Sequence, residues 1–307
     1  MNNHMQKIIA IKVDVDTDRG TRVGVPQLLQ LFAKLKIPAT FLFSLGPDNT
    51  GRAIKRLFRP GFLKKVSRSN IVSIYGIRTL LNGTLLPGPY IGKRHQNVMR
   101  DTIQAGHEVG IHCYDHIRWQ DGLARMTNSE VFAEFAKAQT EFQRIFGFPA
   151  KTAGAAGWQA NAFSLAAYDD AKLLYGSDAR GQFPFFPRVN DIVFNTLQIP
   201  TTLPTLDELL GRSEYPMNKL TPFYLSQLID HIPNTLTVHA EIEGMKYLSW
   251  FKYFLQEAIA QHITFITMET IARQCLVNRN VIPICSLIQG EIEGRSGTLA
   301  IQKIHSP

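Results

Sequence analysis

The sequence has few cysteines and no long apolar segment. Its three cysteines, Cys113, Cys275 and Cys285, are too few for a disulfide-stapled fold, and an odd, sparse count is typical of a reducing compartment. The first apolar run, IIAI within MNNHMQKIIAIKVDVD, is too short for a signal peptide. No run approaches the roughly 18 apolar residues of a membrane-spanning helix. We therefore expect a cytoplasmic protein without a membrane span.

Several catalytic motifs are missing as well. The chain has no Gly-rich phosphate loop and no Gly-x-Ser-x-Gly elbow, which argues against P-loop nucleotide hydrolases and serine hydrolases. The His-x-Glu of VHAEIEG (238–244) lacks the Pro-Cys-x-x-Cys of nucleobase deaminases. His107 and His112 are five residues apart rather than four, so they diverge on a helix and do not form the zinc-protease signature.

Acidic residues are missing from the stretch 49–100, between Asp48 and Asp101. Ahead of Arg100 it carries ten lysines and arginines, interleaved with apolar residues. This mixture is typical of a protein surface that binds an anionic membrane rather than of one that binds nucleic acid. The alternative is a basic face that is simply exposed to solvent. The residues that we expect to face lipid are Lys55, Arg56, Arg59, Lys64, Lys65 and Arg68.

The patterned segments begin in the order strand, helix, strand. KIIAIKVDVD (7–16) predicts a core strand, VPQLLQLFAKLKI (25–37) an amphipathic helix and PATFLFSL (38–45) a second strand. This order predicts a parallel sheet in a single α/β domain. The basic stretch 49–100 interrupts the rhythm and is predicted to be an insertion.

Further segments continue the alternation. GHEVGIH (106–112) returns to strand character, and a helix is predicted over 128–147, capped by Asn128 or Ser129 and ended by Gly147. A late strand over 235–242 and a late helix over 253–263 follow. The tail 276–307 has no clear period and is predicted to be a loose extension.

Two carboxylates close the first predicted strand. Asp14 and Asp16 are two residues apart, so in a strand they point to the same face. Carboxylates this close repel each other, and a bound cation removes the repulsion. The pair predicts a metal ligand beside a general base, with the capping of the turn TDRGT by one Asp as the alternative.

HEVGIHCYDH (107–116) holds three of the nine histidines. His112 and His116 are four residues apart, so on a helical turn they would share a face and could bind one metal ion, with a hydrogen-bonded core histidine at position 112 as the alternative. His107 is out of step and is predicted to be structural. His239, near the end of the late strand, is predicted to be an acid or base, with a structural, hydrogen-bonded histidine as the alternative.

An Asp pair at the first strand, His-x-x-x-His after the second and a late Leu-x-x-His (LTVH) together resemble the NodB-type polysaccharide deacetylases, which are carbohydrate esterase 4-like. The resemblance covers roughly residues 7 to 275. It implies a distorted (β/α) barrel domain over 1–275, with 49–100 inserted before the His-x-x-x-His motif, and an extension 276–307 of unknown role. It also implies one divalent metal ion, with zinc expected and cobalt, nickel or manganese as alternatives.

Carried over by position, the resemblance assigns roles to eight residues. It implies Asp14 as the catalytic base and His239 as the catalytic acid, with Asp178 orienting or tuning that histidine. Many family members carry an Arg-x-Pro ahead of the aromatic of the third motif, and AGAAGW (153–158) has none, so what steadies Asp14 is left open. The metal ligands are Asp16, His112 and His116, the aromatic is Trp158, and the candidate substitute for the missing arginine is Arg180.

Seven segments in order, from DVDTDRGTRVGVPQLL to VHAEIEG, resemble family members that deformylate an undecaprenyl-phosphate-linked 4-deoxy-4-formamido-L-arabinose. This implies a metal-dependent amidohydrolase, peripheral on the cytoplasmic face of the inner membrane. Its amino-sugar product would modify lipid A and protect against cationic peptides such as polymyxin. The alternatives are a deacetylase of another N-acyl sugar and a non-catalytic membrane- or polyanion-binding protein on a degenerate barrel. The oligomeric state is left open.

Reversing Lys64, Lys65 and Arg68 to Glu is expected to reduce binding to anionic vesicles steeply, because three attractive charges become repulsive. Such attraction is screened over about 10 Å at 0.1 M salt, so binding of the parent should also weaken as salt rises. Vesicle sedimentation measures both effects. Activity on the long-chain substrate should fall with binding, whereas cleavage of a short, water-soluble analogue should change little. Undiminished binding by the triple variant would exclude a membrane role for this stretch.

Overall fold

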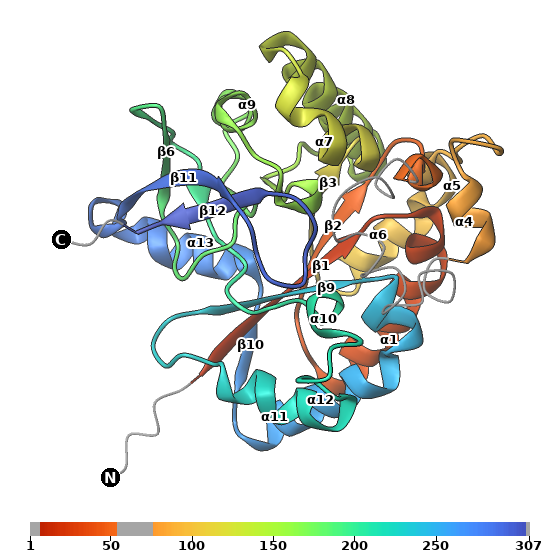
Figure 1. Cartoon of the computed structure of the whole chain (residues 1–307), viewed down its shortest axis with the longest axis vertical. Coiled ribbons are helices and arrows are strands. Elements are labelled where there is room, and N and C mark those ends of the chain that lie inside the picture. The colour runs from red at the N-terminus through yellow and green to blue at the C-terminus, as the bar shows by residue number, and fades with distance from the viewer. Residues whose placement is uncertain (1–6, 54–75, 305–307) are drawn as a thin grey trace.

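Eight parallel strands form the main sheet of the computed structural model, which describes residues 7–53 and 76–304 (Figure 1). The strands follow the order β10-β1-β2-β3-β4-β5-β8, and β9 also pairs with β1. They are β1 (Ile8–Val15), β2 (Thr40–Ser44), β3 (Glu108–Cys113), β4 (Thr152–Ala153), β5 (Tyr175–Gly176), β8 (Leu197–Gln198), β9 (Asn234–His239) and β10 (Thr264–Ile266).

The sheet curls until its two ends approach each other. Beyond β8, the backbone N–H groups of Thr202 and Leu203 lie against β9, where both donate to the carbonyl of Thr235, at 3.1 and 3.2 Å. The predicted distorted (β/α) barrel is therefore confirmed. Parallel strands place their carboxyl ends at one rim of such a barrel, where the chemistry of this architecture is found.

Helices cover the outside of the sheet and connect its strands (Figure 1). They are α1 (Val25–Leu35), α4 (Ile77–Leu81), α5 (Ile91–Arg94), α6 (Gln96–Gln104), α7 (His116–Gly122), α8 (Asn128–Phe146), α9 (Ala162–Asp170), α10 (Leu206–Leu209), α11 (Met217–Ser226), α12 (Leu248–Ala260) and α13 (Met268–Val277). Short helical turns lie at Gly20–Gly24, Leu123–Arg125, Ala156–Trp158, Ile242–Lys246 and Arg279–Val281.

Alternation along β1 separates the hydrophobic core from the barrel interior. Ile11, Val13 and Val15 belong to the main core cluster, together with Leu28 and Phe32 of α1. Successive side chains of a strand point to opposite faces, so Lys12 and Asp14 lie on the other face, and both are buried. The outward face thus anchors β1 by apolar burial, and the inward face carries charge.

The predicted elements agree with these bounds, with corrections at their ends. The first helix ends at Lys36, which adopts a left-handed conformation (φ 56°). The cap of α8 is Thr127, not Asn128 or Ser129, because its hydroxyl and the Glu130 carboxylate form a reciprocal capping box. The part of the predicted insertion from Gln96 onward is α6, the crossover helix between β2 and β3. The late strand ends at His239, and the late helix begins earlier than predicted, at Leu248.

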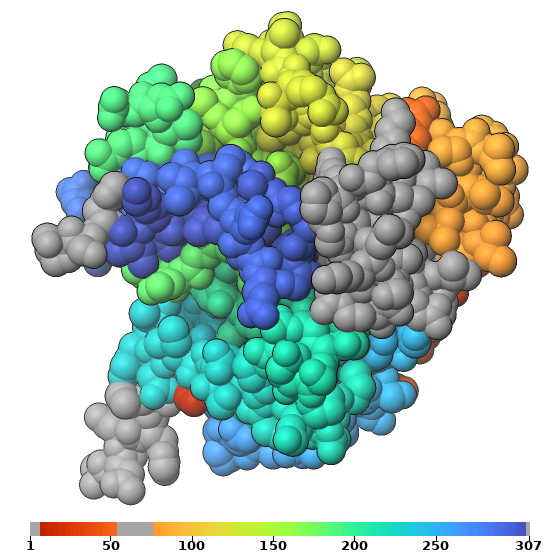
Figure 2. All heavy atoms as spheres, viewed as in Figure 1, coloured from red at the N-terminus to blue at the C-terminus, as the bar shows by residue number. Residues whose placement is uncertain are grey.

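The C-terminal tail is not a loose extension. Its strands β11 (Ile284–Gly290) and β12 (Leu299–Lys303) pair with each other, and β11 pairs in parallel with β6 (Phe186–Val189). With β7 (Ile192–Val193) they form a second, four-stranded sheet. Figure 2 shows the blue C-terminal segment lying on the surface against the green and teal parts of the chain.

The predicted lipid-facing residues Lys55, Arg56, Arg59, Lys64, Lys65 and Arg68 lie outside the described residues. Within residues 7–53 and 76–304, no helix is long and apolar enough to cross a membrane.

Glu108 gives the fold a measurable pH dependence. Burial raises the pKa of Glu108 to about 7, although Thr40, Tyr175 and the Glu269 N–H donate hydrogen bonds to its carboxylate. Because this folded pKa lies above the usual value for Glu, the unfolded chain ionises first as pH rises. The contribution of Glu108 to stability is therefore full below about pH 4.5 and is lost by about pH 7.

We expect the unfolding free energy of the parent to fall relative to that of Glu108→Gln by up to about 3 kcal/mol between pH 4.5 and 8. Denaturant unfolding across this range measures the difference. The exposed Glu291→Gln is the control and should track the parent. A difference between Glu108→Gln and the parent that is independent of pH would contradict the prediction.

Candidate metal centre and active site

Asp16, His112 and His116 converge at the carboxyl end of β1 and β3. Asp16 Oδ1 lies 3.2 Å from His112 Nε2 and 3.5 Å from His116 Nε2, and one donor atom from each residue lies within 4.8 Å of the others. The sequence suggested that His112 and His116 share a helical turn, and this was wrong: His112 is on β3, and His116 begins α7. The turn between strand and helix, with Asp115 capping α7, brings the two rings together instead.

The donor atoms of this cluster suit a cation. His112 Nδ1 lies 2.7 Å from the carbonyl of Gly154, to which it must donate, so in the neutral ring Nε2 presents a lone pair to Asp16. Asp16 Oδ1 is buried and makes no hydrogen bond to a described residue. Two acceptors that face each other across 3.2 Å require a proton or a metal ion between them. A carboxylate oxygen and two imidazole nitrogens are ordinary ligands of divalent metals.

The charges of the cluster support one another. Burial alone would raise the pKa of Asp16, but the neighbouring His116 and His112 outweigh it and hold the pKa well below its usual range. Burial opposes the charged form of His112, yet the carboxylates of Asp14 and Asp16 raise its pKa. Asp16 is therefore held in its anionic form, which could bind a cation.

Glu241, which the sequence reading did not single out, supports the Asp16 segment from just beyond the end of β9. Its Oε1 accepts hydrogen bonds from the Asp16 N–H (3.1 Å), the Thr17 N–H (2.8 Å) and the Thr17 hydroxyl (2.7 Å). Burial, together with the nearby Asp16 charge, raises the pKa of Glu241 well above its usual range. Gly20 leaves room for this carboxyl group, because a Cβ there would lie 1.9 Å from Oε1. The position of Glu241 two residues after His239 was the only sequence signal.

Asp14 and His239 are direct neighbours in the sheet, since β1 and β9 pair Asp14 with His239 in register. Both are buried, and His239 Nδ1 makes no hydrogen bond to a described residue. The His239 N–H donates to Glu243 Oε2 at 2.8 Å. Burial raises the pKa of Glu243 to about 7, against the opposing charge of His239. The two residues predicted to be base and acid thus lie side by side at the rim of the barrel.

Asp178 is not placed against His239. Its Oδ1 accepts from the Ala155 N–H (2.6 Å) and the Tyr168 hydroxyl (3.1 Å), and its Oδ2 accepts from Gln198 (2.8 Å). Burial raises the pKa of Asp178 to about 6, although these hydrogen bonds and Lys12 oppose the shift. These contacts hold the segment that leads to Trp158. The carboxylate that accepts a hydrogen bond from the His239 backbone is that of Glu243.

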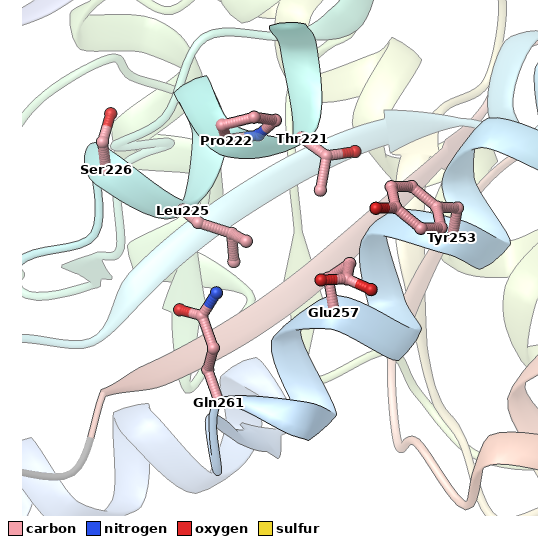
Figure 3. A pocket seen from close by; sticks show the side chains of 7 residues that line it. All are labelled: Thr221, Pro222, Leu225, Ser226, Tyr253, Glu257 and Gln261. Carbon is pink, nitrogen blue, oxygen red and sulfur yellow. The ribbon is translucent and has the colours of Figure 1, made fainter. Parts of the chain in front are cut away.

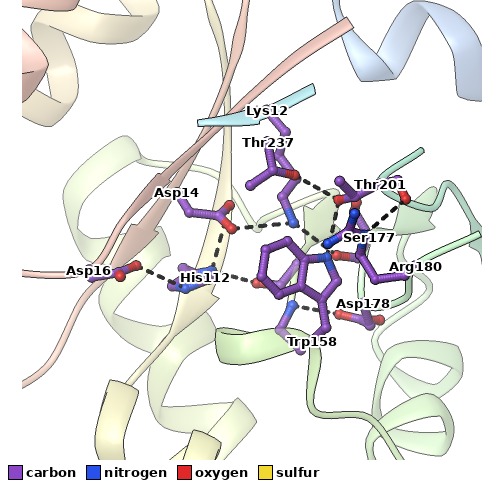
Figure 4. A network of polar contacts seen from close by, with 12 residues as sticks. Lys12, Asp14, Asp16, His112, Trp158, Ser177, Asp178, Arg180, Thr201 and Thr237 are labelled. Atoms are coloured by element: carbon purple, nitrogen blue, oxygen red, sulfur yellow. Dashed lines mark hydrogen bonds and ion pairs between the residues drawn. The ribbon is translucent and has the colours of Figure 1, made fainter. Parts of the chain in front are cut away.

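Arg180 does not contact Asp14 either. Its Nη1 lies 2.6 Å from Glu208 Oε1, Nη2 donates to the carbonyl of Leu203 (2.9 Å) and Nε donates to that of Thr201 (3.4 Å). All three of its side-chain nitrogens therefore contact groups other than the predicted base. Figure 4 shows Arg180 beside Thr201. The cation beside Asp14 is Lys12, whose Nζ lies 3.4 Å from Asp14 Oδ2. A lysine in phase with Asp14 within the apolar run IIAIKVDV was a sequence signal that passed unnoticed.

Trp158 forms a wall of the site. Its indole lies edge-on to His239, with the ring centroids 6.5 Å apart, and its Nε1 donates to the Thr201 hydroxyl at 3.1 Å. Its backbone is left-handed (φ 54°), a conformation that costs free energy in a bulky residue. Arg295, in the connection between β11 and β12, stacks over the ring with its guanidinium carbon 4.4 Å from the centroid. The C-terminal segment thus reaches the site.

Hydrogen bonds and an ion pair hold the described part of the basic stretch beside the cluster of Asp16, His112 and His116. His95 Nε2 lies 2.8 Å from Asp18 Oδ1, and Asp48 Oδ2 accepts hydrogen bonds from the Asp18 N–H (3.0 Å) and from Asn82 (3.1 Å). Burial would raise the pKa of Asp18, but His95 and two arginines lower it below its usual range. Residues 76–95 therefore border the same rim as Asp16.

His107 has a structural place, as predicted. Its Nδ1 accepts a hydrogen bond from the Ala39 N–H at 3.2 Å, and its ring packs against Phe32 and Phe41. Burial lowers the pKa of His107 to about 4, which favours the neutral ring.

A separate hollow of about 370 Å³ lies between α11 and α12 (Figure 3). Its lining includes Thr221, Leu225, Tyr253 and Glu257, and none of the predicted site residues. A single carboxylate with no histidine beside it does not offer the ligands of a catalytic metal.

The curled parallel sheet and the Asp-His-His cluster are accompanied by a family match. Residues 2–173 match the model of the family described as polysaccharide deacetylase, so this chain belongs to that family. It is 37% identical over 295 residues to a protein of Shewanella sediminis (strain HAW-EB3) named probable 4-deoxy-4-formamido-L-arabinose-phosphoundecaprenol deformylase ArnD, covering 96% of this chain and 94% of that protein. That span includes much of 276–307, which the resemblance had been expected to leave out.

Two further relatives agree with this placement. A protein of the same name from Wigglesworthia glossinidia brevipalpis is 35% identical over 286 residues, covering 92% of this chain and 98% of that protein. The crystal structure of a putative polysaccharide deacetylase from Mycobacterium smegmatis superposes with a TM-score of 0.58 at 15% identity, covering 100% of this chain and 97% of that one. At this identity the structural likeness establishes the fold alone.

Each of Asp16→Ala, His112→Ala and His116→Ala is expected to lose bound metal, because each removes one of the three converging ligand atoms. Metal content per chain, measured by mass spectrometry after dialysis, decides the matter. Asp14→Asn should keep its metal, and the exposed His262→Ala is the surface control. Full occupancy in all three ligand variants would rule out this site.

Proposed function

We propose that this protein is a metal-dependent deformylase. Its substrate is undecaprenyl-phosphate-linked 4-deoxy-4-formamido-L-arabinose, which it hydrolyses to formate and the free amino sugar. The observation that carries the proposal is the convergence of Asp16, His112 and His116 beside Asp14 and His239, which are paired in register. The similarity to proteins named as ArnD deformylases over nearly the whole chain supports the choice of substrate.

Three protein ligands leave an open coordination position, as catalytic rather than structural metal sites do. When bound there, a divalent ion supplies Lewis-acid chemistry, polarising the formyl oxygen and making water more acidic. We propose zinc, with cobalt, nickel or manganese as alternatives, because nitrogen and carboxylate donors suit all four.

Asp14 and His239 divide the proton transfers between them. Asp14 Oδ1 makes no hydrogen bond to a described residue and lies 3.9 Å from His112 Nδ1, on the side of the ligand cluster. It accepts a proton from the water whose oxygen attacks the formyl carbon. His239 donates a proton to the sugar nitrogen as the carbon–nitrogen bond breaks, so the nitrogen keeps the bonding electron pair, the amine leaves neutral, and the formic acid that remains loses its proton to solvent to give formate. Their adjacency on neighbouring strands lets them act on the attacking water and on the leaving nitrogen of one formyl group.

The lipid part of the substrate has a suitable surface beside the rim. Ile77, Leu85 and Tyr90 are exposed by 68%, 82% and 45%, and the basic residues Arg78 and Lys93, which are near them in the sequence, are also exposed. A surface with both apolar and basic side chains suits an anionic lipid surface. We propose that this part of 49–100 rests on the cytoplasmic face of the inner membrane, so that the enzyme is peripheral and its product serves the modification of lipid A.

Formate release from the lipid-linked formamido sugar by the metal-loaded protein tests the proposal. We expect release by the parent, and a loss of at least about 10²-fold in Asp14→Asn, because the general base is removed while the metal ligands stay. The acetamido analogue, assayed in parallel, shows whether the protein removes a formyl or an acetyl group.

Two results would contradict the deformylase assignment. Acetate release without formate release would favour a deacetylase of another N-acyl sugar. A protein that binds anionic vesicles but hydrolyses neither substrate, with or without metal, would favour a non-catalytic binding protein.

A further inference from the structure

Lys12 is fully buried on the inner face of β1, two residues before Asp14. Its register partners are Thr40 on β2 and Thr237 on β9, so it is flanked by strands on both sides. A buried ammonium group is costly unless opposite charges and acceptors replace its hydration. Its contacts therefore indicate why the position carries a lysine.

Three groups from different parts of the chain surround the ammonium (Figure 4). Its Nζ lies 3.4 Å from Asp14 Oδ2, donates to the carbonyl of Ser177 at 3.2 Å, and lies 5.1 Å from the ring centroid of Trp158. Two of these contacts do not depend on Asp14, so they hold the ammonium in place as a fixed anchor for the carboxylate.

The ion pair makes the two oxygens of Asp14 inequivalent. Oδ2 is held by Lys12, whereas Oδ1 is buried without a hydrogen bond to a described residue. His112 Nδ1 lies 3.9 Å from Oδ1, but its proton is given to the Gly154 carbonyl at 2.7 Å. Oδ1 is thus left facing the ligand cluster with its lone pairs available.

The local sequence makes room for this arrangement. A Cβ on Gly154 would lie 2.4 Å from Leu42 Cδ1, 3.1 Å from the Ser177 carbonyl oxygen and 3.4 Å from Lys12 Nζ. Any side chain there would press on the carbonyl that accepts from Lys12. The small residues of AGAAGW, which replace the Arg-x-Pro expected from the resemblance, are therefore compatible with a lysine supplied from β1 instead.

Two other cations touch Trp158 but are committed elsewhere. Arg180 and Arg295 have their guanidinium carbons 5.4 and 4.4 Å from the ring centroid. Both form ion pairs with Glu208 Oε1, at 2.6 and 3.3 Å. Lys12 is the lysine or arginine that pairs with Asp14 among the described residues.

We propose that Lys12 is the positioning residue of the catalytic base: it holds Asp14 Oδ2 so that Oδ1 faces the water to be deprotonated. The proposal rests on the proposed role of Asp14. A misplacement of a catalytic group by about 1 Å can cost about 10²-fold in rate. Lys12→Met, which keeps the length and loses the charge, should lower kcat by about 10²-fold with KM within about 3-fold, and should keep its metal.

A double-mutant cycle separates positioning from general support. In the Asp14→Asn background, Lys12→Met should lower kcat by less than about 2-fold, because the group that it positions is already gone. Arg180→Met is the matched control: it also removes a buried cation from Trp158, and its effect should be the same in both backgrounds. Lys12→Arg, which keeps the charge, should recover part of the activity.

Equal effects of Lys12→Met in the two backgrounds would overturn the proposal, as would loss of metal from this variant. If the parent hydrolyses neither the formamido nor the acetamido sugar, the proposed function fails, and a crystal structure of Lys12→Met still decides the role of Lys12. A carboxylate of Asp14 turned away from its place supports the anchor, and an unchanged one overturns it. If Lys12→Met does not fold, Lys12→Gln, which also removes the charge, takes its place in the cycle and in the crystal.

Discussion

Charge on the inner face of β1 has to be paired, because a buried ion loses several kcal/mol of hydration free energy that only opposite charges or hydrogen bonds restore. Lys12 and Asp14 satisfy part of this requirement for each other, 3.4 Å apart. The charge of Asp16 is compensated by the neighbouring rings of His112 and His116. The surrounding strands, the glycine at position 154 and the carboxyl group of Glu241 are arranged around these pairs, so the site is the place where the barrel compensates its buried charge.

The same requirement explains how the more distant parts of the chain join the site. Glu208 binds Arg180 from the loop after β5 and Arg295 from the C-terminal sheet, and both guanidinium groups flank Trp158. A segment that looked detached in the sequence thereby closes one wall. The basic stretch is joined through Asp18 and Asp48, which bind His95 and Asn82. The wall that contains Trp158 and the described part of the basic stretch thus border one rim.

The proposed hydrolysis of a lipid-linked sugar requires a polar reacting group to reach the Asp16–His112–His116 cluster while the lipid stays in the membrane. In this chain the exposed apolar and basic side chains of 77–93 lie next to the carboxyl ends of the strands, where parallel sheets place their chemistry. Under the proposed membrane role, that placement gives a short path from the membrane to the site.

Local pattern determined much of this protein. Alternation and helical spacing predicted β1, α1, β2 and α8 to within a few residues, and residue chemistry singled out Asp14, Asp16, His112, His116 and His239, which the structure gathers at one rim. The tertiary structure alone decided the partners. Asp178 and Arg180 contact Ala155 and Glu208 rather than the acid and the base, and Lys12 and Glu241 take the supporting places. Side-chain pairs between residues far apart in the chain depend on strand register and on which groups remain uncompensated after burial, and neither quantity is encoded in local periodicity.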